Sequence, residues 1–292
     1  MGPARVQRTM PSGRGCVVVG TLASMDRSPR PERVLIAAVQ SGDRAAIEEL
    51  LERHERQIYR FGLRMCGNED DARDVLQETM LAAFRSLTDF RGDAELSTWL
   101  FQIARSFCIK ERRRERPTGP LDEAAGEIAE TSAGPEARAH AHEIGTALAV
   151  AIAGLPPEQR EVVVLRDVEG LGAEQAAHVV GIEVGALKSR LHRARQELRS
   201  RLLTLLGEDV ELGAPPPCPE LAQALSRYVS AEIDQATCAS IEEHLVGCPR
   251  CAGACDALKR TVSMCRSIPG NEVPPSVRAA VRHAIRDLTF PP

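Results

Sequence analysis

Apolar side chains recur every three or four residues over much of the chain, which is the spacing of one face of an α-helix. The clearest run lies within residues 70–87 and predicts an amphipathic helix of about 20 residues. The pattern predicts further helices over residues 97–114, 158–168, 173–180, 184–206 and 277–288. Only 3% of the residues are aromatic, while Ala, Leu, Val and Arg abound, which favours short helical bundles over sandwiches or barrels. We therefore expect an all-α protein.

Stretches rich in Pro, Gly and small or acidic residues lack this periodicity and divide the chain into three helical blocks. The predicted order is a disordered extension at 1–30, a first block at 31–116, a flexible linker at 117–141, a second block at 142–207, a Pro-rich linker at 208–217 and a third block at 218–292. Met25 is a candidate alternative start. Because no stretch reaches the roughly 18 to 20 apolar residues that cross a membrane, we expect a cytoplasmic protein without a membrane partner, whose thiols stay reduced.

The net charge of −4 hides two basic stretches. Residues 101–117 and residues 182–206 each hold six Lys or Arg against two Glu. Separate basic stretches in a mildly acidic chain predict two anion-binding surfaces.

In the first block, the helix within residues 70–87 carries acidic and amide side chains opposite its apolar face, including Asp74, Gln77 and Glu78. Taken alone, they indicate a solvated face near a helix N-terminus. The helix at 97–114 is expected to bury Trp99, Leu100, Ile103, Ala104 and Phe107, and to expose a cluster of basic side chains: Arg105, Lys110, Arg112, Arg113 and Arg114. That many cations beside aromatic rings fit a phosphate backbone.

The second block has the layout of a helix-turn-helix, with a short helix, a turn at Gly181 and a long basic helix from Val184. Leu187, Leu191, Ala194, Leu198 and Leu202 are its predicted buried positions, and the basic residues are predicted to face outward: Lys188, Arg190, Arg193, Arg195 and Arg199. The alternative is an ordinary helical hairpin with a solvated basic face.

The third block holds six of the nine cysteines. Its His244-x3-Cys248-x2-Cys251 spacing suits a metal, because a His and a Cys four residues apart share one face of a helix. A packed tail with buried free thiols is the alternative.

Two segments of the second block, Leu155–Val162 and Gly181–Arg195, resemble region 4 of extracytoplasmic-function (ECF) sigma factors. Asp70–Glu78, Phe90–Asp93 and Ser97–Leu100 resemble region 2. The resemblance implies a transcription initiation factor that binds core RNA polymerase and promoter DNA and is not an enzyme. It implies three sets of contact residues: Asp74, Gln77 and Glu78 for the polymerase clamp; Arg91, Trp99, Arg105, Lys110, Arg112 and Arg113 for the −10 element; and Lys188, Ser189, Arg190 and Arg193 for the −35 element.

The chain departs from the family at three positions. Gly172 and Glu183 stand at helix starts where the family often has Ser, and Glu is outside the usual capping residues. Ser106 replaces a frequent Asn, which puts the detailed −10 preference in doubt.

The tail resembles the zinc-binding fold of anti-sigma factors, which implies Cys218 as the fourth ligand beside His244, Cys248 and Cys251. A fused tail of this kind is similar to the copper- and cadmium-responsive CorE-like branch, so zinc is the expected cofactor and copper or cadmium the alternative sensed metal. Three further thiols are candidate sensing groups: Cys238, Cys255 and Cys265. Two alternatives remain open, namely redox sensing by a cysteine pair and an adaptor tail that binds a separate protein around a structural zinc.

Overall fold

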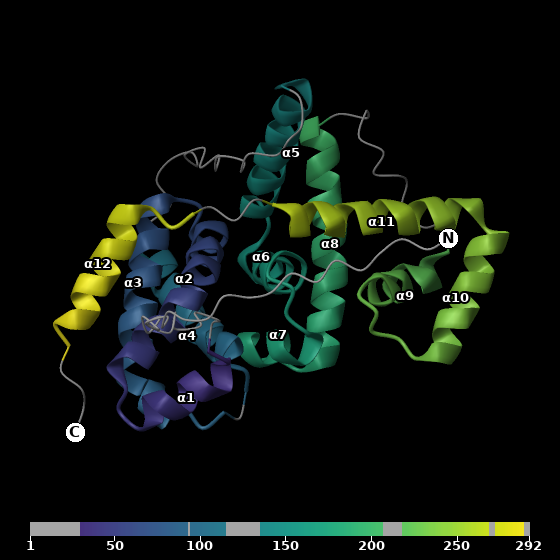
Figure 1. Cartoon of the computed structure of the whole chain (residues 1–292). Coiled ribbons are helices and arrows are strands. Elements are labelled where there is room, and N and C mark those ends of the chain that lie inside the picture. Colours follow the sequence, from purple (N-terminus) through teal and green to yellow (C-terminus); the bar gives the residue numbers. More distant parts are fainter. Residues whose placement is uncertain (1–29, 93, 115–134, 207–217, 269–271, 289–292) are drawn as a thin grey trace, which may run out of the picture. The chain divides into compact units, whose positions relative to one another are not determined.

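The structure is a computed structural model that describes residues 30–92, 94–114, 135–206, 218–268 and 272–288. Over this part of the chain every regular element is helical, which confirms the all-α prediction (Figure 1). The elements are α1 (Glu32–Gln40), α2 (Arg44–Cys66), α3 (Glu69–Ser86), η1 (Leu87–Asp89), α4 (Leu96–Arg114), α5 (Pro135–Ala153), α6 (Pro157–Val163), η2 (Val164–Val168), α7 (Ala173–Val180), α8 (Val184–Leu206), α9 (Pro219–Val229), α10 (Gln235–Gly247), α11 (Pro249–Ser267) and α12 (Pro275–Arg286).

Short polar side chains begin several of these helices. The carboxylate of Asp43 accepts hydrogen bonds from the first turn of α2, and Asn68 and Asp234 do the same for α3 and α10. Gly67 and Gly181 end α2 and α7 with φ values of 88° and 75°, a conformation that glycine adopts without strain. The turn predicted at Gly181 is therefore confirmed.

The helix predicted at 158–168 is not a continuous α-helix. It runs as α6 to Val163 and then widens into the π-helical turn η2, closed by a hydrogen bond from the Glu169 amide to the Val164 carbonyl at 2.8 Å. This turn buries Arg166 and Asp167 together with their apolar neighbours. The next difference is at α5, which begins at Pro135, inside the stretch predicted as a linker.

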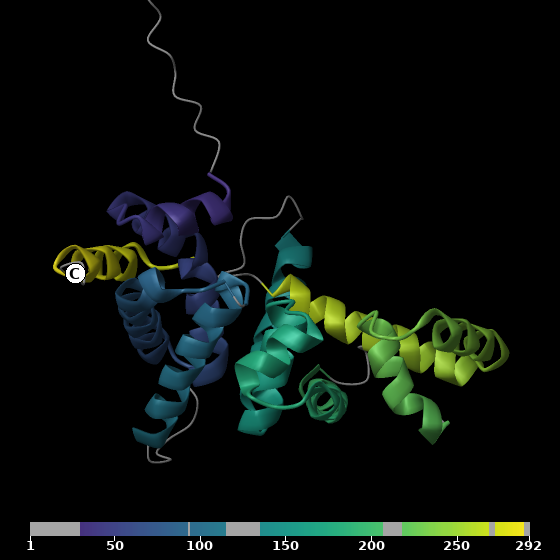
Figure 2. The same cartoon turned by 90° about the horizontal axis from the view of Figure 1, so that it is seen from below.

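A continuous hydrophobic core runs through α1 to α8. The apolar face predicted for α3 is confirmed, since Val75, Leu76 and Met80 are fully buried. The tail adds to this core through residues of α11 and α12 and their connection: Cys265, Ile268, Val273, Val277, Val281 and Ile285. Helix α12 packs against α3, and Figures 1 and 2 both show the two helices side by side.

A second, smaller core lies between the other helices of the tail. Leu225 of α9, Ile241 of α10 and Cys255 of α11 form it. The predicted extension at 1–30 lies outside the described residues except for Arg30, as do residues 117–134 of the first predicted linker and all of the second. The predicted domain boundaries stay a prediction. Among the described helices, none is both long and apolar enough to span a bilayer.

Candidate nucleic-acid interface and metal centre

Three cysteines and one histidine of the tail converge on one point. The ligand atoms of Cys218, His244, Cys248 and Cys251 all lie within 4.8 Å of one another. Cys218 precedes α9, His244 lies in the last turn of α10, Cys248 joins α10 to α11, and Cys251 lies in the first turn of α11. Three helices therefore meet at this cluster.

The donor set fits a tetrahedral metal ion of the zinc type. Zinc binds thiolates at about 2.3 Å and imidazole nitrogens at about 2.0 Å, so four ligands around one ion lie roughly 3.5 Å apart. The Nε2 atom of His244 is buried without a hydrogen-bond partner, as expected for an atom that needs a metal. A hydrogen bond from the Cys251 amide lowers the pKa of Cys248, whereas burial raises the pKa of Cys251 to about 11.

The three remaining tail thiols do not meet. Cys238 is half-buried on α10, within 3.5 Å of a Glu242 carboxylate oxygen. Cys255 lies in the small tail core, and Cys265 lies in the main core. Cys255 and Cys265 share α11 but are ten residues apart, a rise of about 15 Å. A single sensing site made of all three thiols is therefore not formed in this structure.

The long basic helix α8 carries the residues predicted to read the −35 element. Arg193 is exposed, and Lys188, Ser189 and Arg190 are half-buried. The Lys188 ammonium lies 3.6 Å from the Glu232 carboxylate, and the Ser189 hydroxyl accepts a hydrogen bond of 3.2 Å from the Gln223 amide. Both partners belong to the tail: Gln223 to α9, and Glu232 to the turn that follows it.

The prediction that Arg195 faces outward is wrong. Its side chain is 2% exposed and donates to both oxygens of Asp167, at 2.8 and 2.5 Å. It also donates to the Ser226 carbonyl at 2.8 Å and to the Ser230 hydroxyl at 3.0 Å. The π-helical turn presents Asp167 to α8, and α9 closes over the pair from the other side. Arg199 was also predicted outward and is half-buried, and this burial lowers its pKa.

The sequence did contain a clue to the ion pair between Asp167 and Arg195. Asp167 lies in a run of apolar residues that is fully buried, and a buried carboxylate requires a hydrogen-bonded cation. The pattern could not say which arginine supplies it.

The residues predicted for the −10 element are in several environments. Arg91 is exposed, Trp99 packs on Phe90 with 5.3 Å between ring centroids, and the exposed Lys110 has its ammonium 6.0 Å from the Phe107 ring. Arg105 is not free, because it forms an ion pair with Glu161 of α6.

The buried face of α4 also differs from the prediction. Leu96, Leu100, Phe101, Ala104 and Cys108 fill the core, whereas Trp99, Ile103 and Phe107 are only half-buried. Arg112 is half-buried as well, and the side chain of Arg113 lies outside the described residues. The helix is rotated relative to the predicted one because Phe101 and Cys108 take the core positions.

The acidic face predicted for polymerase binding is largely exposed. Asp74 and Glu78 are exposed on α3, and Gln77 is half-buried. Partial burial raises the pKa of Asp74, and the carboxylates of Glu111 and Asp71 raise it further. A cationic partner would relieve this repulsion between like charges.

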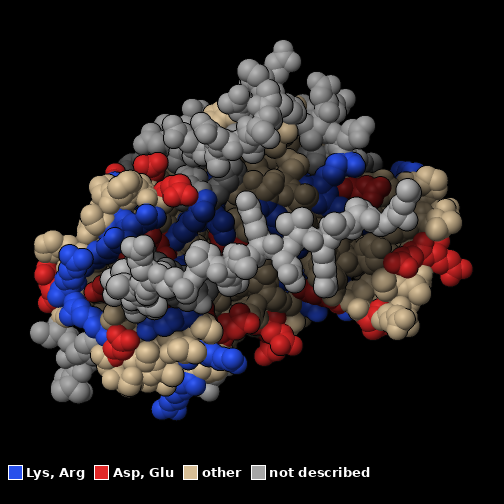
Figure 3. Space-filling model, viewed as in Figure 1, with Lys and Arg blue, Asp and Glu red and all other residues tan. Residues whose placement is uncertain are grey.

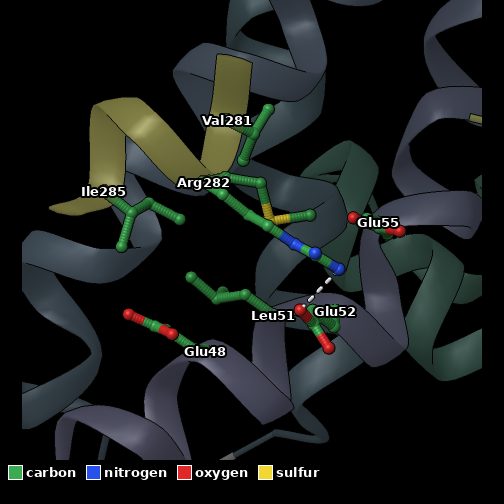
Figure 4. A pocket seen from close by; sticks show the side chains of 8 residues that line it. Glu48, Leu51, Glu52, Glu55, Val281, Arg282 and Ile285 are labelled. Carbon is green, nitrogen blue, oxygen red and sulfur yellow. Dashed lines mark ion pairs between the residues drawn. The ribbon is translucent and has the colours of Figure 1, made fainter. Parts of the chain in front are cut away.

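The last helix, α12, is bound to α2 by polar contacts around a shallow pocket that residues of both helices line (Figure 4). Arg282 pairs with Glu52 at 2.7 Å, and Arg278 pairs with Glu55. Arg44 donates to the carbonyl of Ile285 near the end of α12, at 2.7 Å, and to the carbonyl of Leu288 just after the helix, at 3.1 Å. Figure 3 shows basic side chains gathered over α12, with acidic ones beside them.

Three family models match the chain. "Sigma-70 region 2" matches residues 50–118, "Sigma-70, region 4" matches residues 146–198, and "Putative zinc-finger" matches residues 218–252. The last range contains all four residues of the Cys/His cluster.

The chain is similar to curated ECF sigma factors. It is 37% identical over 190 residues to "ECF RNA polymerase sigma factor SigM" of Mycobacterium tuberculosis. The aligned region covers 64% of this chain and 91% of that protein. It is 31% identical over 179 residues to SigW of Bacillus subtilis, and this aligned region covers 58% of this chain and 96% of that protein. Among solved structures, a structure of CnrH in complex with the cytosolic domain of CnrY matches with 29% identity and a TM-score of 0.46, over 59% of this chain and 97% of that one.

Proposed function

This chain belongs to the family of ECF RNA polymerase sigma factors, and from that premise we propose that its Cys/His tail is a built-in, metal-dependent restraint on promoter reading. As a member of the family, it binds core RNA polymerase and promoter DNA and acts as a transcription initiation factor rather than as a catalyst. The proposal concerns what regulates that activity.

The restraint rests on one observation: the tail contacts the helix assigned to −35 recognition. Lys188 and Ser189 of α8 are engaged by Glu232 and Gln223 of the tail. A Lys ammonium and a Ser hydroxyl that already have protein partners are less available to base edges and phosphates. Glu232 supplies an anionic oxygen to Lys188, which is the chemistry that a DNA phosphate would supply.

The metal centre is connected to this contact through α9. Cys218 is the residue directly before α9, and α9 contacts α8 with Gln223 and Ser226. Thiolate ligands of a small domain couple metal binding to folding. A metal held by Cys218, His244, Cys248 and Cys251 would fix the start of α9, and its loss would loosen α9 from α8. Zinc fits this role, and the soft thiolates also accept copper or cadmium.

The remaining roles follow the same assignment. We assign residues 31–116 to region 2, 142–207 to region 4 and 218–292 to the restraining tail. Asp74, Gln77 and Glu78 would contact the polymerase. Arg91, in the segment before α4, and Lys110 of α4 would contact the −10 element. Lys188, Ser189, Arg190 and Arg193 of α8 would contact the −35 element. Arg105 would take part only after it separates from Glu161.

The test is promoter binding by the full chain in defined metal states. Fluorescence anisotropy with a labelled −35 duplex, and transcription with core polymerase, would compare zinc-loaded, chelator-treated, copper-loaded and cadmium-loaded protein. Removing zinc is expected to raise −35-dependent binding. Unchanged binding by a protein that has lost its zinc would contradict the restraint, whereas a protein that never binds zinc would contradict the metal centre itself. Cys238→Ser is a matched control because Cys238 lies outside the cluster.

A further inference from the structure

A second pair of thiols lies far from the tail cluster, in the first block. Cys66 is the last residue of α2, and Cys108 lies in the middle of α4. Their Sγ atoms are 3.7 Å apart, and both cysteines are free. The residues are 42 positions apart in the sequence, so the fold alone brings them together.

The pair is within reach of a disulfide bond. A disulfide joins its sulfurs at about 2.0 Å, so the two atoms would need to approach by roughly 1.7 Å. Cys66 is placed to make that movement, because it ends its helix and is followed by Gly67 in the left-handed conformation. Cys66 is half-buried, which gives a small oxidant access to one sulfur, while Cys108 is fully buried behind it.

Two guanidinium groups lie near the thiols. Arg160 of α6 donates a 3.0 Å hydrogen bond to the carbonyl of Met65, the residue before Cys66. Arg112 follows Cys108 by one helical turn, and its Nε atom is buried without a hydrogen-bond partner. Positive charge favours the thiolate, which is the reactive form of cysteine. Contact with Cys66 and burial raise the pKa of Cys108, which leaves Cys66 as the attacking group.

We propose that Cys66 and Cys108 are a reversible dithiol–disulfide site that hydroperoxides oxidise. The Cys66 thiolate attacks the peroxide oxygen, which breaks the O–O bond and leaves a sulfenic acid on Cys66. The Cys108 sulfur then attacks the Cys66 sulfur, its proton leaves with the displaced oxygen as water, and the S–S bond forms. In sum, two thiols lose two electrons and two protons, and the hydroperoxide is reduced to an alcohol and water.

The site lies where the first block contacts the second block. Arg160 reaches α2 at Met65, and Arg105 of α4 pairs with Glu161 of α6, so α2, α4 and α6 meet around the thiols. A disulfide would fix the end of α2 to α4, the helix with the proposed −10 contacts. Oxidation would thus act on the first block independently of the metal in the tail.

Peptide mapping of the full, zinc-loaded chain tests the proposal without a variant. The protein would be treated with graded hydrogen peroxide, blocked with an alkylating reagent while unfolded, and digested with trypsin without reductant. Trypsin releases Cys66 in residues 65–73 and Cys108 in residues 106–110, each with one cysteine, apart from all tail cysteines. The expected product is these two peptides joined, two hydrogen atoms lighter than their sum and separated again by dithiothreitol.

Cys66→Ser is the matched variant, because its side chain is half-buried and the change is small. It should lose the joined peptide and leave Cys108 alkylated. Peroxide should also raise the Tm of the first block in the wild type but not in Cys66→Ser. Sulfinic acid on residues 65–73 with Cys108 still reduced would overturn the proposal, and so would disulfides confined to the tail.

Discussion

The Glu232 carboxylate lies 3.6 Å from the Lys188 ammonium and also accepts a hydrogen bond from Arg166. One acidic side chain of the tail thus neutralises two cations of the second block, and one of them belongs to the helix assigned to the −35 element. The side chains of Lys188, Arg166 and Glu232 are all mostly buried. Solvent therefore screens these ion pairs less than it screens pairs on an open surface.

Replacing this carboxylate should release the −35 helix. Glu232→Gln keeps the shape but removes the charge, at a cost of about 1–2 kcal/mol in tail docking. Because 1.4 kcal/mol is a tenfold change, −35 duplex binding by the zinc-loaded chain should strengthen by up to roughly 5- to 30-fold. Anisotropy titrations would measure this, with Glu243→Gln on the exposed side of α10 as the control. Equal affinity in the two variants would contradict the contact as a restraint.

The buried pair of Arg195 and Asp167 should matter for stability more than any exposed arginine of α8. Both side chains are 2% exposed, and removing one partner leaves an uncompensated charge inside the protein. Arg195→Leu should therefore lower the free energy of unfolding by about 3–5 kcal/mol. The exposed Arg193→Leu should change it by less than about 0.5 kcal/mol. Urea denaturation of both variants would measure the difference, and similar midpoints would argue against the buried pair.

Promoter recognition should depend on the half-buried Arg190 and the exposed Arg193. Arg190→Ala and Arg193→Ala, each made together with Glu232→Gln, should weaken −35 duplex binding by about 1–3 kcal/mol. Arg201→Ala is the matched control, because Arg201 lies on the same helix and pairs with Glu197 at 2.9 Å. All of these variants should bind core polymerase as the parent does. Undiminished promoter binding in both test variants would refute the proposed orientation of α8.

Polymerase binding should depend on the exposed acids of α3. Asp74→Arg reverses a charge on this face and should weaken association with core polymerase at least tenfold, without loss of folding, because the side chain is exposed. A pull-down or a light-scattering titration would measure the association. Glu158→Arg on α6 makes the same change at another exposed position and should have no such effect.

The metal cluster can be tested by stoichiometry. Cys251→Ser should lower bound zinc from about one ion per chain to none, and should loosen the tail helices while α1 to α8 stay folded. Cys238→Ser should keep the ion, because this thiol is outside the cluster. Zinc analysis together with hydrogen exchange would separate the two results. Full zinc retention in Cys251→Ser would rule out the four-ligand site.

Helix periodicity and ligand spacing predicted most of what is local. The apolar face of α3 and the turn at Gly181 follow directly from the order of residues. The spacing of His244, Cys248 and Cys251 also needs only one helix and the turn after it. Interactions over a few residues are the ones that a pattern encodes.

Long-range packing was the part that the pattern could not give. Arg195 lies one step from the outer face of α8, and only the π-helical turn and α9 decide that it is buried. Cys66 and Cys108 look like isolated residues until α2 and α4 pack. The docking of α12 on α2 likewise depends on two helices more than 200 residues apart.

The attachment of α12 to the first block has a consequence for how the restraint would operate in a cell. When α9 leaves α8, the tail is still held by α12, so its local concentration near α8 stays in the millimolar range of short tethers. Rebinding is then a first-order event whose rate does not depend on how much protein is made. A separately encoded inhibitor must be produced in proportion to its target, whereas here the ratio is fixed at one to one by the gene. The response would therefore follow the chemical state of the ligand cluster alone, at any expression level.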